Sequence, residues 1–344
     1  MKEENLRKAL YLKFYPRIGN RKTKEIIEKS LWDTVDLNQK EAKEKTDAEL
    51  EKISRLKVST VTLFDENYPS LLKEIYDPPI VLYYYGSLET ALPLGVVGTR
   101  KPSRYGVKAV RKLVGDLVCQ GVEIVSGLAY GIDTEAHYET LENKGKTLAV
   151  MGSGIDITYP SSNQRLRDLI LQEGGAVVSE FPIGTKPAPF TFPMRNRIIS
   201  GLSLGVLVGE AGENSGAIIT AKNANDQGRQ VFAIPGMIET ESFTGNHALI
   251  RQGAALVRNA GDILDEISFY RQNKLETKET VKSQPKNLIL SEEENLVLSL
   301  LKEPVSIDEL IQTTGMSVPK ILSLLTQLSL KDAVEERGGV YNKK

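Results

Sequence analysis

The chain has 344 residues, which at roughly 150 residues per domain predicts two domains, or three if one of them is small. Hydrophobic residues make up 40% and charged residues 26% of the chain, which excludes a mostly disordered or fibrous protein. The one cysteine, Cys119, excludes an internal disulfide, and 44 basic against 45 acidic side chains give a net charge of -1, which excludes long-range attraction of polyanions by the whole molecule.

The composition also bounds the compartment and the chemistry. No apolar run approaches the roughly 18 residues of a membrane helix, and the start MKEENLRKALYLKFYP lacks the apolar region of a secretory signal. We therefore expect a cytoplasmic protein without a membrane segment. Only His137 and His247 titrate near neutrality without perturbation, which disfavours hydrolases built on histidine.

Residues 1–59 show helical periodicity, with apolar residues at Leu6, Leu10 and Phe14, and they include the charged stretch NQKEAKEKTDAELEKISRLK. We predict a small helical domain. Within it, PRIGNRKTKEII places a glycine turn before a helix, as in half of a helix-hairpin-helix that offers backbone amides to phosphate. A turn between two packed helices is the favoured interpretation.

From Thr60 onward short apolar runs predict strands. The first two, STVTLF and PIVLYYYG, are rich in β-branched and aromatic residues. Seven further runs are separated mostly by helix-like stretches: LGVVG, VEIVSG, TLAVMG, AVVSE, LGVLVG, VFAIPG and AALV. Continuous Val/Ile-rich runs between helices are typical of parallel strands buried on both faces. Residues 60–273 are therefore predicted to form a nine-stranded, mostly parallel, doubly wound α/β domain.

Residues 274–287, KLETKETVKSQPKN, carry no apolar periodicity and are predicted to be a linker. Residues 288–344 then contain three short amphipathic segments, followed by DAVEERGGVYNKK, in which Gly338 and Gly339 suit a two-stranded wing. This spacing predicts a winged helix. Its third helix carries little positive charge, only Lys320 with Lys331 beyond it, which favours contact with protein over reading of DNA.

In a doubly wound sheet, ligands bind beyond the carboxyl ends of the strands, and these positions are rich in glycine and hydroxyl residues here. After the first parallel run, GTRKPSRYG offers a glycine, a hydroxyl and two adjacent cations ahead of a helix whose N-terminal amides attract anions. Later runs are followed by SGLAYGID, GSGIDITYPSSN, SEFPIGTKP and GEAGENSGAIITA, the last of which places Glu210 near the same edge. The pattern predicts a phosphate site there.

Two further groups of cations follow strands. TFPMRNRIISGLS places Arg195, Asn196 and Arg197 at the start of a helix, where cations are disfavoured unless a ligand compensates them. A phosphate clamp is therefore favoured over an exposed turn that pairs with acidic neighbours. A second group shares one face of the helix after the first loop and by itself favours a solvated face: Lys108, Arg111 and Lys112.

The sequence does not match the common nucleotide-binding and metal-binding motifs. The dinucleotide fingerprint requires a third glycine where GSGIDI has Ile157. The phosphate loop of ATPases requires a first glycine where Thr140 stands, and the GKT that follows runs into a strand. Asp133 and His137 form only an isolated i, i+4 pair, so we predict neither a metal site nor a cofactor.

Six strings occur in order over residues 60–265: GVVGTRKPSRYG, IVSGLAYGIDTEAH, GSGIDITYPSSN, SEFPIGTKPAPFTFPMRNRIISGLS, EAGENSGAIITA and VFAIPG. Together they closely resemble the DNA processing protein A (DprA, or Smf) family. The resemblance implies an extended Rossmann-like domain that binds single-stranded DNA without cutting it, flanked by a helical domain of the SAM or helix-hairpin-helix type and by a winged helix. It also implies a non-catalytic homodimer that protects incoming DNA in natural transformation and loads the RecA recombinase onto it.

The resemblance also places the DNA-binding positions of the family on this chain. The phosphate loop is Gly98, Thr99 and Arg100, followed by Lys101, and Thr99 keeps the hydroxyl of the serine that is commoner in the family. The remaining positions surround this loop: Ser126, Gly127, Ser153, Gly154, Asn163, Arg195, Asn196, Arg197, Ser215 and Gly216.

One lysine of the family has no evident counterpart. Members commonly show it near the YPxxN loop, but this chain has Ser161 and Ser162 there, which leaves Arg165 or Lys186 as candidate replacements. Three aromatic side chains offer either stacking surfaces to bases or core packing: Tyr105, Tyr159 and Phe190.

Two other functions stay open. Related Rossmann-like families that cleave nucleoside monophosphates place a glycine-rich loop and a glutamate at the corresponding crevice. Glu210, Ser215 and Gly216 loosely resemble that arrangement, although the full signature is missing. Alternatively, the chain is a pure interaction module whose terminal domains bind partner proteins.

Overall fold

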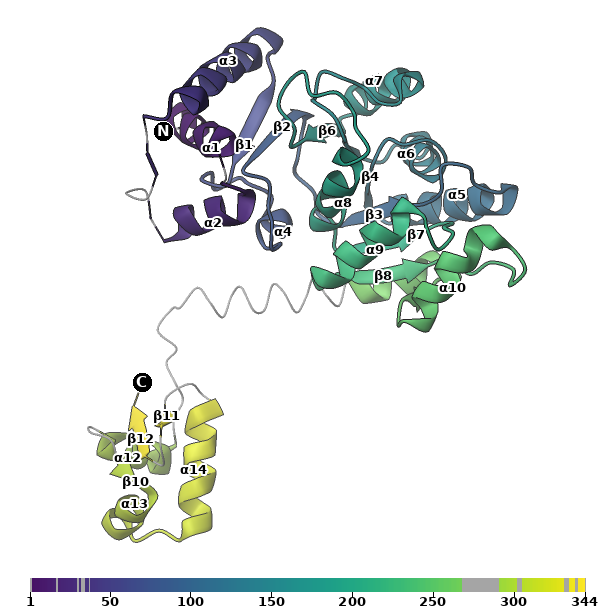
Figure 1. The fold of residues 1–344 in the computed structure, drawn as a ribbon. Coiled ribbons are helices and arrows are strands. Elements are labelled where there is room, and N and C mark those ends of the chain that lie inside the picture. Colours follow the sequence, from purple (N-terminus) through teal and green to yellow (C-terminus); the bar gives the residue numbers. More distant parts are fainter. Residues whose placement is uncertain are drawn as a thin grey trace. The chain divides into compact units, whose positions relative to one another are not determined.

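The computed structural model describes residues 2–16, 18–29, 31, 35–36, 38–267, 291–301, 305–330, 334–337 and 340–343; the expected linker, 274–287, lies outside them. The chain divides into two compact units, Met1–Lys274 and Leu275–Lys344 (Figure 1). Each unit has an apolar core of its own. Within the described residues, no helix has both the length and the apolar character needed to cross a membrane.

A nine-stranded sheet in the order β1-β2-β6-β5-β4-β3-β7-β8-β9 forms the centre of the first unit. Its strands are β1 (Ser59–Thr62), β2 (Val81–Gly86), β3 (Pro93–Val97), β4 (Glu123–Ser126), β5 (Thr147–Val150), β6 (Ala176–Ser179), β7 (Gly205–Val208), β8 (Gln230–Ala233) and β9 (Ala255–Leu256). Strand β2 is antiparallel to both β1 and β6, and the pairings from β6 through β9 are all parallel. The expected nine-stranded, mostly parallel sheet is confirmed.

Helices accompany this sheet on both faces. They are α1 (Lys2–Phe14), α2 (Asn20–Glu28), α3 (Lys40–Leu56), α4 (Ser70–Lys73), α5 (Arg104–Val118), α6 (Ile132–Glu142), α7 (Gln164–Gln172), α8 (Thr191–Gly201), α9 (Gly216–Asp226) and α10 (Thr244–Arg251), with short turns η2 (Ser161–Asn163) and η3 (Glu241–Phe243). In β3, Val97 packs with α8 and α9, whereas Val96 packs with α5 and α6 on the opposite face. Burial of both faces explains why the strands are continuous apolar runs.

The strand order reverses beside β3. The chain steps from β3 to β4, β5 and β6, and α8 then carries it back to β7 on the other side of β3. The segments that leave β3 and β7 therefore run in opposite directions. Such a reversal leaves a crevice at the carboxyl ends of the two strands, and this is where open α/β sheets bind ligands.

The N-terminal helices are fixed to the sheet by buried polar contacts. The Glu49 carboxylate on α3 accepts a 2.7 Å hydrogen bond from the amide of Ile183, and the Lys13 ammonium on α1 donates a 2.6 Å bond to the carbonyl of Glu180. The Ile183 amide and the Glu180 carbonyl both lie in the loop after β6. The start of α2 packs as well, because the Arg21 guanidinium lies 5.0 Å from the ring centroid of Tyr76.

The second unit is a winged helix, as expected. It consists of α12 (Glu292–Leu300), β10 (Val305–Ser306), α13 (Ile307–Thr314), α14 (Val318–Leu330), β11 (Val334–Arg337) and β12 (Val340–Lys343). Strand β12 is antiparallel to both β10 and β11, while the glycines expected in the wing, at 338 and 339, lie outside the described residues. On α14, the Lys320 ammonium is 2.7 Å from the Glu293 carboxylate, so this cation is already paired.

One histidine of the sheet unit is buried in its neutral form. On α6, the Nδ1 atom of His137 lies 2.7 Å from the Thr147 hydroxyl, whose own proton is donated to the carbonyl of Ile124 at 2.7 Å. Nδ1 must therefore carry the proton, and Nε2 has no hydrogen-bond partner within the described residues. Burial, together with the positive charge of Arg195, lowers the pKa of His137 to about 3.

We expect His137 to make folding sensitive to acid. Its folded pKa lies below the 6.5 of an unperturbed histidine, so its contribution is complete above pH 6.5 and is lost as the pH falls toward 3. For each unit by which the pH decreases between 6.5 and 3, the wild type should lose about 1.4 kcal/mol more unfolding free energy than His137→Gln. Urea unfolding at successive pH values measures this difference, and equal slopes for the two proteins would contradict it.

Candidate functional site

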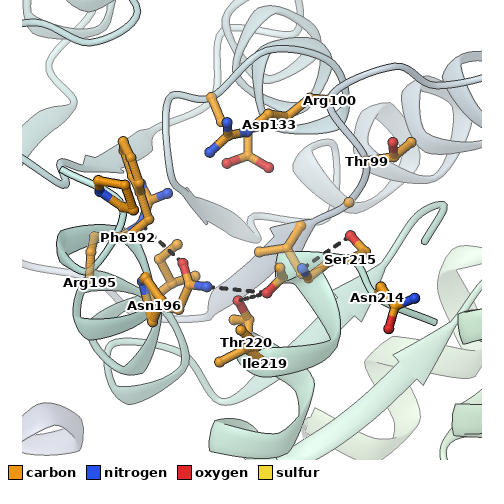
Figure 2. A pocket seen from close by; sticks show the side chains of 18 of the residues that line it. Thr99, Arg100, Asp133, Phe192, Arg195, Asn196, Asn214, Ser215, Ile219 and Thr220 are labelled. Atoms are coloured by element: carbon orange, nitrogen blue, oxygen red, sulfur yellow. Dashed lines mark hydrogen bonds between the residues drawn. The ribbon is translucent and has the colours of Figure 1, made fainter. Parts of the chain in front are cut away.

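A hollow of about 580 Å³ lies in the crevice beyond β3 and β7 (Figure 2). Its walls come from the loop after β3, the start of α6, the start of α8 and the first turns of α9. Eight of the residues predicted from the sequence line it: Gly98, Thr99, Arg100, Lys101, Arg195, Asn196, Ser215 and Gly216. The fold therefore brings together three segments that lie up to about a third of the chain apart.

The loop after β3 supplies the exposed cations of the hollow. The Thr99 amide donates a 2.6 Å bond to the carbonyl of Glu210, which ties the ends of β3 and β7 together. Arg100 and Lys101 are exposed, and the Arg100 guanidinium lies 5.3 Å from the ring centroid of Phe192. Figure 2 shows Arg100 near Asp133 on one side of the hollow, facing the residues of α9.

Arg195, by contrast, is a buried cation. Its Nη1 atom donates to the carbonyls of Gly127 and Val150, and its Nε atom donates to the Asn196 side chain at 3.2 Å. These contacts connect α8 to the ends of β4 and β5. A side chain at Gly127 would overlap the guanidinium, which explains the glycine. Burial lowers the pKa of Arg195 to about 10, against the attraction of Asp133, so the side chain is charged at neutral pH.

Asp133 on α6 is the acidic member of the lining. Its carboxylate accepts a 3.1 Å bond from the amide of Gly127. Burial raises the pKa of Asp133, and the positive charge of Arg195 opposes that rise. With Arg100 and Lys101 also present, the charged side chains of the lining are three cations and one carboxylate. In the part of the chain that the structure describes, His, Cys, Asp and Glu form no group of three able to hold a metal ion.

The N-terminus of α9 closes the hollow on its other side. Ser215 caps this helix, because its hydroxyl accepts a 3.3 Å bond from the amide of Ala217. The Asn196 amide donates a 3.2 Å bond to the carbonyl of Gly216 and so holds α8 against α9. The positive end of a helix of 11 residues thus faces the hollow, where it favours an anion.

Several predicted residues lie behind the hollow and hold its loops. The hydroxyl of Ser126 donates to the carbonyl of Val96 at 2.6 Å, and that of Ser153 donates to the carbonyl of Ile157 at 2.6 Å. These side chains do not line the hollow.

Asn163 and Gly154 have similar supporting positions. The Asn163 amide donates to the carbonyl of Leu128 at 2.9 Å, and the Gly154 amide donates to the carbonyl of Thr185 at 2.8 Å. Arg165 and Lys186, the candidate replacements for the missing lysine, are both exposed and do not line the hollow.

Arg197 pairs with acidic neighbours, which was the less favoured interpretation of TFPMRNRIISGLS. Its guanidinium donates to the Glu180 carboxylate at 2.6 and 3.0 Å and to Asp77 at 3.1 Å. The side chains of Arg197 and Glu180 are only 12% and 4% exposed, and Arg197 does not line the hollow. This ion pair between Arg197 and Glu180 therefore holds α8 against the end of β6.

Glu210 likewise has a supporting position. It is fully buried, and its carboxylate accepts bonds from the amide and the hydroxyl of Ser103 at 2.9 and 2.8 Å. Ser103 caps α5, so Glu210 fixes the start of this helix. Glu210 does not line the hollow, and this placement gives no support to a nucleotide-cleaving site built on it.

The three aromatic residues that the sequence left undecided are exposed rather than in the core: Tyr105 by 51%, Tyr159 by 45% and Phe190 by 67%. Tyr159 lies 5.5 Å from Phe192 between ring centroids. Sequence reasoning missed Phe192 itself, along with Ile219 and Thr220. The helical period could have found the last two, because they lie one turn beyond Ser215 and Gly216.

Arg197 should matter for stability. Arg197→Met leaves the buried Glu180 carboxylate without its bidentate partner, and we expect a loss of about 3 kcal/mol of unfolding free energy. The double variant Arg197→Met/Glu180→Gln should recover at least half of this loss, because residue 180 then no longer buries an unpaired negative charge. Urea unfolding of the three proteins measures both effects, and a loss in Arg197→Met below about 1 kcal/mol would refute the pairing as a stabilising contact.

Two family models match the chain: DNA recombination-mediator protein A over residues 59–268, and the DprA winged helix domain over residues 281–339. The DNA processing protein DprA of Streptococcus pneumoniae is 46% identical over 215 residues, which cover 62% of this chain and 76% of that protein. The protein Smf of Escherichia coli is 37% identical over 286 residues, which cover 80% and 75%.

Solved structures agree with the sequence matches. The X-ray structure of DprA from Streptococcus pneumoniae has a TM-score of 0.68 at 39% identity and covers 76% of this chain and 97% of that one. A structure of DprA from Helicobacter pylori, described for its single-stranded DNA binding mode, has a TM-score of 0.55 at 28% identity and covers 63% and 96%. The matches cover most of the chain, including the sheet with its hollow and the winged helix. The chain therefore belongs to the DprA (Smf) family of DNA recombination-mediator proteins.

Proposed function

We propose that the hollow binds single-stranded DNA. The observation that carries this proposal is the convergence of Arg100, Lys101, Arg195 and the N-terminus of α9 on one crevice that contains a single carboxylate. Backbone phosphates are the ligands that such a concentration of donors and positive charge favours. The net charge of -1 makes this local concentration essential, because the molecule as a whole offers no attraction. The described single-stranded DNA binding of the Helicobacter pylori relative supports the proposal.

Aromatic surface beside the cations favours a single strand over a duplex. Arg100 lies over the ring of Phe192, and the half-exposed Tyr159 lies next to that ring. Bases can stack on such rings only when they are unpaired, and stacking tolerates any sequence. In this proposal the phosphates lie on the cations while neighbouring bases lie against the aromatic rings, so binding depends on strandedness and little on sequence.

In this proposal the bound strand is not cut. Asp133 is the carboxylate that lines the hollow, and it accepts a hydrogen bond from the amide of Gly127, whereas Glu210 does not line the hollow. We therefore expect oligonucleotides and a panel of nucleoside monophosphates to be recovered intact after incubation with the protein. Release of free base from any of them would favour a nucleotide-processing enzyme instead.

Membership of the family supports a wider role that we also propose. A cytoplasmic homodimer of this chain protects incoming single-stranded DNA during natural transformation and loads RecA onto it. The direct assay is the DNA-dependent ATPase activity of RecA on a strand already coated by a single-strand-binding protein, with and without this chain. A shorter lag before RecA hydrolyses ATP supports the loading of RecA by this chain, and an unchanged lag argues against it.

Arg100→Ala should weaken binding to oligo-dT by roughly tenfold and reduce the slope of log affinity against log salt by about 0.7, because one phosphate contact is lost. Fluorescence anisotropy over a salt series measures both quantities. Lys222→Ala is the matched control, since Lys222 is an exposed cation on α9 that does not line the hollow. Equal affinities for the two folded variants would remove Arg100 from the site.

A further inference from the structure

A second, shallower hollow of about 430 Å³ lies on the surface of α5. It is lined by Pro102 and by four residues of one helix face, Arg104, Val107, Lys108 and Arg111. Positions spaced by three and four residues share a face of an α-helix, so Arg104 and Lys108 lie beside the apolar Val107. The lining of this hollow thus combines apolar residues with cations.

The three cations of α5 that line this hollow are of two kinds. The Arg111 guanidinium lies 2.8 Å from Glu135, 3.9 Å from Glu139 and 3.7 Å from Glu142, so it balances the carboxylates that α6 presents to α5. Arg104 and Lys108 are exposed and, within the described residues, neither forms an ion pair. Arg104 lies in the first turn of α5, where the helix dipole disfavours an unpaired cation.

The two hollows meet along the chain. Lys101 lines the deep hollow and the next residue, Pro102, lines the shallow one. The cations therefore continue from Lys101 to Arg104 and on to Lys108. The rise of an α-helix places Arg104 and Lys108 about 6 Å apart along its axis. At this spacing the two side chains can contact separate phosphates of one strand.

We propose that the surface of α5 is a second phosphate-binding site for the single strand that leaves the deep hollow past Lys101. Arg104 and Lys108 each contact one phosphate of that strand, and Pro102 and Val107 lie under its sugars. This inference rests on the proposed function of the deep hollow. It extends the binding site from the crevice of the sheet along the outside of one helix, and it makes affinity depend on the length of the strand.

Strand length distinguishes the two sites. The test uses labelled oligo-dT of about six nucleotides, which is long enough for the deep hollow alone, and of about 20 nucleotides, which can also reach α5. Arg104→Ala/Lys108→Ala should bind the short strand within twofold of the wild type. It should bind the long strand about tenfold more weakly, with a salt slope smaller by about 1.4, because two phosphate contacts are lost.

The matched control is Lys222→Ala/Arg251→Ala, which removes the same two charges from exposed positions on α9 and α10. The α5 site is refuted if the two double variants bind the long strand equally, or if Arg104→Ala/Lys108→Ala weakens the short and the long strand to the same extent. Failure of the wild type to bind the short strand would instead refute the deep hollow as a DNA site. Circular dichroism checks that the variants keep their helical content.

Discussion

The burial of one positive charge, that of Arg195, governs the arrangement of the site. A cation removed from water must be compensated by polar partners, and here these are the carbonyls of Gly127 and Val150, the side chain of Asn196 and the nearby carboxylate of Asp133. The partners come from the ends of β4 and β5, from α6 and from α8. Satisfying Arg195 therefore fixes four elements at once, and the deep hollow is the space that remains between them and α9.

This constraint separates the structural cations from the binding cations. Arg195 and Arg197 are buried in networks that hold α8 against the strand ends, so their guanidinium groups are already occupied. Arg100 and Lys101 are exposed on a loop whose base is anchored by the Thr99 amide. Long exposed side chains on an anchored loop can follow the backbone of a flexible strand, whereas the buried Arg195, which lines the hollow, contributes a fixed positive charge.

The sequence predicted the sheet because its signal is local: each parallel strand is a short Val/Ile-rich run between helices. The loops at the strand ends were predictable for the same reason. The partner of each polar side chain was not, because it comes from a distant segment. Arg195 and Arg197 are two residues apart on one helix and therefore point in different directions, one toward the ends of β4 and β5 and the other toward Glu180 and Asp77. Nothing in TFPMRNR distinguishes the two arginines. The cavity-lining Phe192 was missed because Phe190, Pro193 and Met194 close to it are also apolar.

Binding of single-stranded DNA in the deep hollow is tested most directly by the fluorescence anisotropy of labelled oligo-dT and of a duplex of the same length. Both are titrated with the wild-type protein across a salt series. We expect tight binding of the single strand at low salt, steep weakening as salt rises and much weaker binding of the duplex. No binding of the single strand at low salt, or equal binding of the duplex, would contradict this expectation.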